Sequence, residues 1–232
     1  MSSRPLAGTV AASALVLAGA LSGCGVAGTG FHPGVAAQVG DDQIKVSQVD
    51  RIASDYCSAI REQLRGENQV LPLRYLRGGV AGQLALVAAA EQLAEEHGVE
   101  PGRQYDQKVA ELENAVAELP EGQQDAVIAI ESSSTYLAGV QEAVGTKLLR
   151  EEGTAQPTPT EAAQAGQEAF NAWLEEQDVA IDPQFGVALR DGQAVPTDTS
   201  LSHAVGTTAR NGDADTPDPE YAGSLPATLR CG

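Results

Sequence analysis

Positive charge is scarce in this sequence. Only 14 Lys and Arg residues stand against 32 Asp and Glu residues in 232, which gives a formal net charge of −18. Nucleic-acid phosphates would repel such a chain, so we expect no nucleic-acid partner. The same average charge disfavours anionic lipid head groups. A net charge of this size gives information about partners and solubility but not about the fold.

Histidine is also scarce, and its three copies are far apart at His32, His97 and His203. They fall in a spacer, a helix end and a polar tail, so neither a catalytic triad nor a two-His metal face is available locally. An acidic run near the C-terminus lacks the central Gly of a calcium loop and contains two prolines, which favours a solvated tail. The run comprises Asp213, Asp215, Asp218 and Glu220. We therefore predict no enzyme: no catalytic residue, no cofactor and no metal ligand.

A long apolar run occurs only at the N-terminus, where Leu6 to Leu21 is uncharged and follows Arg4. This pattern is typical of an export signal. Its many Gly, Ser and Thr residues make it less hydrophobic than a typical membrane-spanning helix. The run ends in Leu21-Ser22-Gly23-Cys24, which resembles the bacterial lipobox, whose Cys thiol is diacylated. An ordinary secretory signal with a chance Cys is the alternative. We predict a signal peptide over 1–23 and lipidation of Cys24.

The predicted lipid would hold this acidic chain at the extracytoplasmic face of the cell membrane. Burial of acyl chains in the bilayer provides a binding energy that the charge of the chain does not. Residues 24–34 are rich in Gly and are predicted to be a flexible spacer. Lipidation of Cys24 leaves two cysteines, Cys57 and Cys231, in an oxidising compartment where they are able to pair. We predict a disulfide between them that docks the segment 221–232 on the domain. A buried free Cys57 and a free or intermolecular Cys231 remain open.

Hydrophobic periodicity predicts a mainly α fold, a bundle of about five helices with a small N-terminal β-hairpin and a short C-terminal strand, over 35–190. Two strands, Val35–Val39 and Gln43–Val46, flank a Gly-Asp-Asp turn. Helices are expected from a Ser47 cap to about residue 66, over 71–97, from about 105 to 119, over 122–150, and after a Thr160 cap. Residues 178–189 are expected to be extended, and 191–220 to be a disordered acidic tail.

The arrangement resembles the N-terminal chaperone domain of SurA-like envelope proteins, related to the helical part of trigger factor. The resemblance lies in AAQVGDDQIKVSQVD, in the long helix that finishes with AEEHGVE, and in DVAIDPQFG after the last helix. The last motif is similar to the close of actinobacterial members, and the resemblance covers roughly Val35 to Val187. It implies a surface that holds extended or unfolded exported polypeptides.

Many members of that family carry a parvulin-type prolyl isomerase domain before the last helix. Here the corresponding space is the linker Gly153 to Pro159, which is too short for a domain of ordinary size. Isomerase activity is therefore not expected. The alternative function is a non-enzymatic scaffold lipoprotein that docks one folded cell-envelope partner. Only nine residues are Phe, Trp or Tyr, which favours weak, nonspecific binding over an aromatic hot spot.

Overall fold

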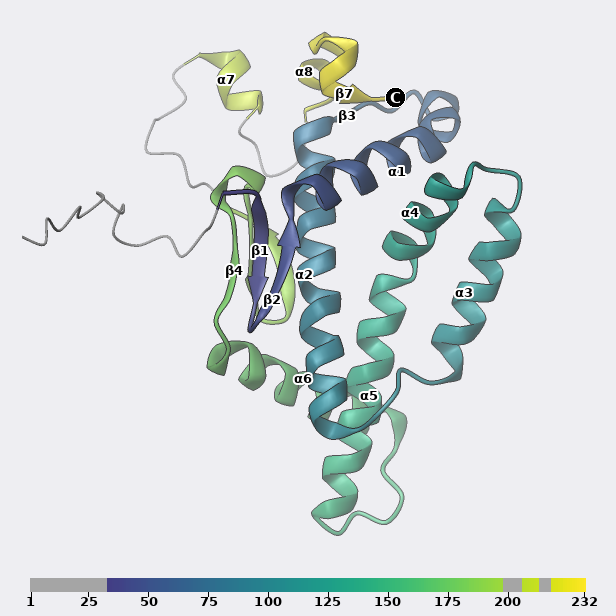
Figure 1. Cartoon of the computed structure of the whole chain (residues 1–232), viewed down its shortest axis with the longest axis vertical. Coiled ribbons are helices and arrows are strands. Elements are labelled where there is room, and N and C mark those ends of the chain that lie inside the picture. Colours follow the sequence, from purple (N-terminus) through teal and green to yellow (C-terminus); the bar gives the residue numbers. More distant parts are fainter. Residues whose placement is uncertain (1–32, 198–205, 213–217) are drawn as a thin grey trace, which may run out of the picture. The chain divides into compact units, whose positions relative to one another are not determined.

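The computed structural model describes residues 33–197, 206–212 and 218–232 (Figure 1). They belong to one compact unit that extends from Phe31 to Gly232. The fold is mainly helical, with an N-terminal β-hairpin and a short C-terminal strand, as the sequence predicts. The helices of the described part are α1 (Val46–Gly66), α2 (Leu73–His97), α3 (Arg103–Val116), α4 (Glu121–Glu131), α5 (Ser133–Glu151), α6 (Pro159–Glu176), α7 (Thr207–Gly212) and α8 (Pro219–Ser224).

The strands form three small antiparallel sheets. They are β1 (Val35–Val39), β2 (Asp42–Lys45), β3 (Leu71–Pro72), β4 (Val179–Ile181), β5 (Val187–Arg190), β6 (Gln193–Pro196) and β7 (Arg230–Cys231). The first sheet has the order β2-β1-β4, so the chain after α6 returns to pair with the first strand. The other sheets pair β3 with β7 and β5 with β6. The predicted hairpin is confirmed, and its turn contains Gly40 at φ +54°, where glycine is favoured.

Helix α2 lies at the centre of the core and buries a face made mostly of Ala, Gly, Val and Leu. At two of its glycines, Gly78 and Gly82, other segments of the chain approach the helix backbone closely. A Cβ at Gly78 would meet the backbone carbonyl of Phe185, and a Cβ at Gly82 would meet the side chain of Ala194. The β5–β6 hairpin and the turn before it therefore pack directly on α2. The helix ends at His97, and the following Gly98 adopts the left-handed conformation that commonly terminates helices.

Helices α5 and α6 cross at even closer range. A Cβ at Gly145 would overlap the carbonyl of Ala162, and a Cβ at Gly166 would overlap the backbone of Gln141. The two backbones are thus in contact, with no side chain between them at the crossing. Farther along α6, the Trp173 indole is buried, and its Nε1 donates a hydrogen bond to the Glu96 carboxylate at 2.9 Å. This bond ties α6 to the end of α2.

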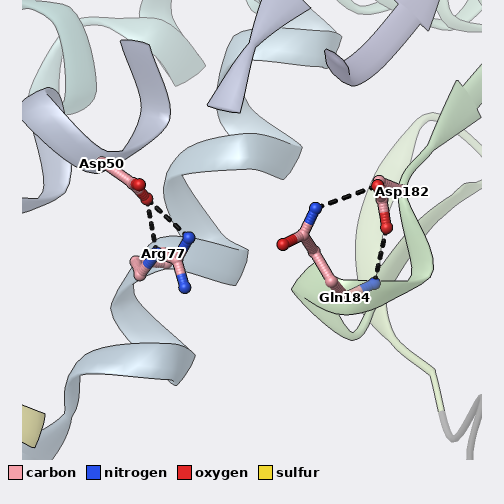
Figure 2. A network of polar contacts seen from close by, with 4 residues as sticks. All are labelled: Asp50, Arg77, Asp182 and Gln184. Atoms are coloured by element: carbon pink, nitrogen blue, oxygen red, sulfur yellow. Dashed lines mark hydrogen bonds and ion pairs between the residues drawn. The ribbon is translucent and has the colours of Figure 1, made fainter. Parts of the chain in front are cut away.

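Figure 2 shows an ion pair between α1 and α2 and, beside it, the turn that follows β4. The Arg77 guanidinium donates to Asp50 at 2.6 Å and lies over the Phe185 ring, 5.3 Å from its centroid. In the turn that carries Phe185, the Asp182 carboxylate accepts hydrogen bonds from the backbone and side-chain nitrogens of Gln184, each at 2.9 Å. Arg77 therefore contacts both α1 and the chain that follows β4.

The predicted single helix over 122–150 is two helices, α4 and α5, separated at Ser132. Both serines at the break are buried, and both hydroxyls bond backward to carbonyls, Ser132 to Ile128 and Ser133 to Ile130. Serine hydroxyls compete in this way with the helical ladder. Because the Ser133 hydroxyl, whose single proton is shared between two acceptors, also lies 2.9 Å from the side-chain oxygen of Gln83 on α2, the break is held by tertiary contact.

The predicted disordered tail over 191–220 is wrong where the structure describes it. Strand β6 and helix α7 lie inside that range, and α8 begins at Pro219. The β5–β6 turn has Asp191 and Gly192 at φ +50° and +70°, the conformation that an Asp-Gly hairpin turn requires. Residues 198–205 and 213–217 of the expected tail lie outside the described residues.

Two expected helix caps are also corrected. Helix α1 begins at Val46 with Lys45 as the preceding residue and no side-chain cap, so Ser47 lies inside the helix. Helix α6 is capped by Thr158 rather than Thr160, and Glu161 completes a capping box with it. Pro159 explains the shift, because proline suits the first position of a helix and places the cap one residue earlier.

Candidate functional site: a groove beside α3

The predicted lipidation residue, Cys24, and the signal peptide over 1–23 lie outside the described residues. Among the residues that the structure describes, no helix is long and apolar enough to span a bilayer. Two of the three histidines, His32 and His203, also fall outside the described part. The third, His97, occupies the last turn of α2, where its backbone carbonyl accepts a hydrogen bond from the Lys147 ammonium at 2.6 Å.

The predicted disulfide is present and joins Cys57 on α1 to Cys231 on β7, with 5.6 Å between the Cα atoms. Both cysteines are buried in a small apolar cluster with Leu64, against which Ile60, Leu71 and Leu76 pack. The bond docks the C-terminal segment on the domain, where β7 pairs with β3. We call this part of the molecule the stapled end and define its surface by Arg61, Arg65, Arg74, Tyr75 and Leu229, each adjacent or nearly adjacent in sequence to a cluster residue.

A groove of about 590 Å³ opens between the loop after α2, the first turns of α3 and one face of α5. Such a volume lies within the range of roughly 300–1,000 Å³ that ligand sites occupy. Its lining comprises Glu100, Pro101, Gly102, Arg103, Gln104, Gln107, Ala138, Gly139, Glu142, Ala143, Thr146 and Arg150. The part of the lining that α5 contributes includes three small residues, Ala138, Gly139 and Ala143. A Cβ at Gly139 would overlap the Pro101 carbonyl, so glycine is what lets the loop approach α5.

The charged and amide side chains of the groove are exposed or half-buried and form no hydrogen bond or ion pair with the described residues. Gln104 and Gln107 are three residues apart on α3, which places their amides on the same side of the helix. Neither forms a side-chain hydrogen bond to the described residues, and each amide offers two donors and an acceptor. The four charged lining residues likewise form no ion pair there. Two are basic and two acidic, so the groove has no net preference for one sign of charge.

The wall formed by α3 is lightly attached. Of its fourteen residues, only Val116 is buried. Near its start, Tyr105 packs edge-on against Tyr136 of α5, with ring centroids 5.1 Å apart. Burial raises the pKa of Tyr136, and the charge of Glu91 and the neighbouring Tyr105 raise it further, so the phenol stays neutral at physiological pH. Figure 1 shows α3 standing beside α4 and α5 at the edge of the helical layer.

A hydrogen bond between side chains joins α4 to α1. The Tyr56 hydroxyl on α1 donates to the Glu131 carboxylate at the end of α4. Burial first, then this bond, raises the pKa of Tyr56 above its ordinary value. Helix α4 is thus anchored to α1, while α3 is held chiefly by one aromatic contact and the burial of Val116.

No group of His, Cys, Asp and Glu side chains in the described part of the chain is arranged to hold a metal ion. No family model, no curated protein and no solved structure matches this chain. The resemblance to SurA-like chaperone domains therefore stays a prediction that rests on the quoted sequence motifs.

Sequence reasoning located the disulfide but missed the groove. The sequence predicts a helix from about 105 to 119 but no role for its polar side. Two signals were present: the small residues Ala138, Gly139 and Ala143 on one face of α5, and the glutamines at three-residue spacing on α3. Neither signal identifies a groove alone, because the groove depends on where α3 packs.

Proposed function

We propose that this protein is a lipid-anchored, extracytoplasmic chaperone-like protein that holds unfolded or extended exported polypeptides in the groove beside α3. It has no isomerase domain and acts by binding alone. The observation that carries the proposal is the groove itself, which two exposed glutamines of α3, Gln104 and Gln107, line together with small residues of α5.

The amide pair suits the backbone of an extended chain. Each glutamine is able to accept from a backbone N–H and donate to a backbone C=O, so binding would depend little on the side chains of the client. The floor of Ala138, Gly139 and Ala143 leaves space for those side chains. Rim charges of both signs, with Arg103 and Glu142 among them, accommodate clients of either charge. These features together favour weak and general binding over recognition of one sequence.

Aggregation suppression tests the proposal. The chain from Gly25, without the lipid, is added at equal molar amount to a reduced client that unfolds and scatters light. We expect it to delay aggregation, and the Gln104→Ala/Gln107→Ala variant to lose most of the delay. The matched control is Gln164→Ala/Gln167→Ala, because these residues have the same spacing on exposed positions of α6. Absence of any delay by the unaltered chain rejects the proposal, and equal activity of both variants rejects the groove as the site.

The anchor has its own test. Replacement of Cys24 by Ala is expected to release the protein from the membrane fraction or to leave it as an unprocessed precursor. Fractionation and gel migration identical to those of the unaltered protein would show that Cys24 carries no lipid.

A further inference from the structure

The lining of the groove contains no large apolar side chain. It consists of charged and amide residues, small residues, Thr146 and Pro101. Unfolded polypeptides differ from folded proteins because they expose large aliphatic and aromatic side chains that folding buries. The groove in its described form is therefore suited to the backbone of a client but offers no contact to those side chains.

Large apolar side chains lie next to the groove, between α3 and α5. Tyr105, Val109 and Leu112 follow one another at four- and three-residue spacing on one side of α3, and all three are half-buried. None of them belongs to the main core, against which Tyr136 of α5 packs. The Tyr105 and Tyr136 rings meet edge-on. Their separation would expose Tyr136 one turn from Gly139 in the groove lining, on the same side of α5.

The two ends of α3 are attached unequally. At the C-terminal end, Val116 is buried, and the Gln124 amide of α4 donates to two carbonyls of the turn after α3, at 2.7 and 3.3 Å. At the N-terminal end, the helix is held by the contact between Tyr105 and Tyr136. The Pro101 carbonyl in the preceding loop touches α5 by packing. The helix is thus fixed at its end and able to move at its start.

The loop before α3 has the conformational freedom that such a movement requires. Gly98 and Gly102 have φ of +60° and +82°, and a Cβ at either position would meet nothing within 4 Å. From Tyr105 to Val116 the helix rises about 16 Å, so a pivot of about 20° around Val116 moves Tyr105 by about 6 Å. Ring centroids in aromatic pairs lie about 4.5–7 Å apart, so this movement admits one further ring.

We propose that α3 is a lid that pivots on its C-terminal end and opens to admit a large apolar side chain of the client. This inference rests on the proposed function, because it concerns the same groove. Opening separates Tyr105 from Tyr136, and the client side chain takes the place of the Tyr105 ring. Gln104 and Gln107 hold the neighbouring backbone, and α3 then closes on the client. The clients are therefore extended segments that carry a large apolar side chain.

Two labelled extended peptides, identical except for a central Phe or Ser, test the proposal. They are titrated with the unlipidated chain from Gly25, which keeps the entire compact unit, and fluorescence anisotropy measures the affinities. We expect the Phe peptide to bind about fivefold more tightly than the Ser peptide, the effect of one aromatic contact. Tyr105→Ala is expected to bind the Phe peptide about fivefold more tightly again, because the contact that keeps the lid closed is absent.

Two variants serve as controls, and thermal melts establish that each variant folds. Tyr105→Phe keeps the ring pair and is expected to bind the Phe peptide within about twofold of the unaltered chain. Arg77→Gln removes the ion pair with Asp50, about 30 Å along α2 from the loop before α3, and is also expected to bind within about twofold. This second control shows whether general destabilisation raises the affinity.

A second variant opens the lid by a different route. A Cβ at Gly139 would overlap the Pro101 carbonyl, so Gly139→Ala forces the loop away from α5 without altering the ring pair. If Tyr105→Ala does not fold, the affinity of Gly139→Ala for the Phe peptide supplies the result. It is expected to exceed that of the unaltered chain.

Amide hydrogen exchange in the absence of client tests the pivot separately. After correction for intrinsic rates, we expect residues 107–111 to exchange at least about tenfold faster than residues 112–116, because the start of α3 opens more often than its end. Tyr105→Ala is expected to speed exchange of residues 107–111 about fivefold and to leave residues 112–116 unchanged. Uniform exchange along α3 would overturn the pivot.

Three binding outcomes also overturn the inference: equal affinity for the two peptides, no gain in affinity from opening the lid, or the same gain from Arg77→Gln. Binding of neither peptide overturns it as well. If aggregation of the client is then still delayed, the proposed function stands without the lid, and if aggregation is not delayed, both are rejected. Failure of the lid and failure of the chaperone proposal are therefore separate results.

Discussion

The α5–α6 pair and helix α3 are held to the same bundle by opposite means. At the α5–α6 crossing, Gly145 and Gly166 bring two backbones together, and Phe170 and Trp173 of α6 are buried in the main core. Helix α3 buries a single residue, Val116, and otherwise leans on α4 and α5. A wall that is close-packed and a wall that is lightly attached thus lie on the two sides of α5.

This difference locates where the protein is able to adapt. Close-packed interiors resist changes of even a methylene group, whereas segments with few buried apolar contacts open at low free-energy cost. The groove combines both properties, because its floor is α5 and its opposite wall is α3. A rigid floor with a movable wall suits a site that must accept extended chains of varied sequence.

The largest effect is expected at the close-packed crossing. Gly166→Val places a branched side chain where the Gln141 backbone already lies. The backbone of α5 is less able to move aside than the end of a flexible side chain. We therefore expect a loss of about 3 kcal/mol or more in the free energy of unfolding, or failure to fold. Urea unfolding measures the change.

Gly79→Ala on α2 is the control, since a Cβ there meets nothing within 4 Å. It is expected to stabilise the protein by about 0.5–1 kcal/mol through the higher helix propensity of alanine. Equal destabilisation by both substitutions would show that close packing at the crossing is not what makes Gly166 necessary.

A second, smaller effect is expected at the stapled end, where a covalent bond supplements a modest core. Cys57→Ala/Cys231→Ala removes the disulfide without leaving a free thiol at either position. We expect a loss of roughly 2–4 kcal/mol and early proteolytic cleavage within the C-terminal segment. Unchanged unfolding in urea and an intact C-terminal segment would show that β3–β7 pairing and the apolar cluster hold the segment without the bond.

A third effect tests how lightly α3 is attached. Tyr105→Ala removes the edge-on contact with Tyr136. An aromatic pair of this kind contributes about 0.5–1.5 kcal/mol beyond burial. We expect a loss of about 1 kcal/mol, with faster amide hydrogen exchange confined to α3, while Tyr105→Phe keeps the contact and the slow exchange. Faster exchange that spreads to α6 would show that α3 belongs to the same cooperative unit as the α5–α6 pair.

The smallest effect concerns the first turn of α6. Hydrogen bonds from the backbone and side chain of Thr158 lower the pKa of Glu161. A lowered folded-state pKa contributes stability that is present above the unfolded value, near 4.5, and is lost as the pH falls through the folded value. We expect Glu161→Gln, which cannot titrate, to lose less stability than the unaltered protein between pH 6 and roughly pH 3. Parallel pH profiles of the two proteins would contradict this assignment.

The elements that were correctly predicted are those with local causes. Alternating apolar residues around a Gly-Asp-Asp turn predict β1 and β2. Apolar residues with a period of 3.6, followed by Gly98, predict α2. The disulfide followed from the number of cysteines and the predicted compartment. The prediction of a disordered tail over 191–220 is wrong at its start, where Asp191-Gly192 is a local signal typical of a hairpin turn.

Other features depend on tertiary contacts that no local pattern contains. The break between α4 and α5 has neither Gly nor Pro, and it is fixed by buried hydroxyls and by Gln83 on another helix. The groove exists because Gly139 admits the loop at Pro101, which sets where α3 begins. Such placement follows from packing between elements distant in sequence.

Hydrogen exchange of the bound complex tests the central claim most directly. The chain from Gly25 is exchanged with and without an excess of a reduced, carboxymethylated polypeptide that remains unfolded. We predict slower exchange in α3 and in the loop before it, because client binding would fix the lightly attached wall, and no change at the α5–α6 crossing around Gly145 and Gly166. Unchanged exchange in α3, or protection found only at the stapled end, would contradict the account.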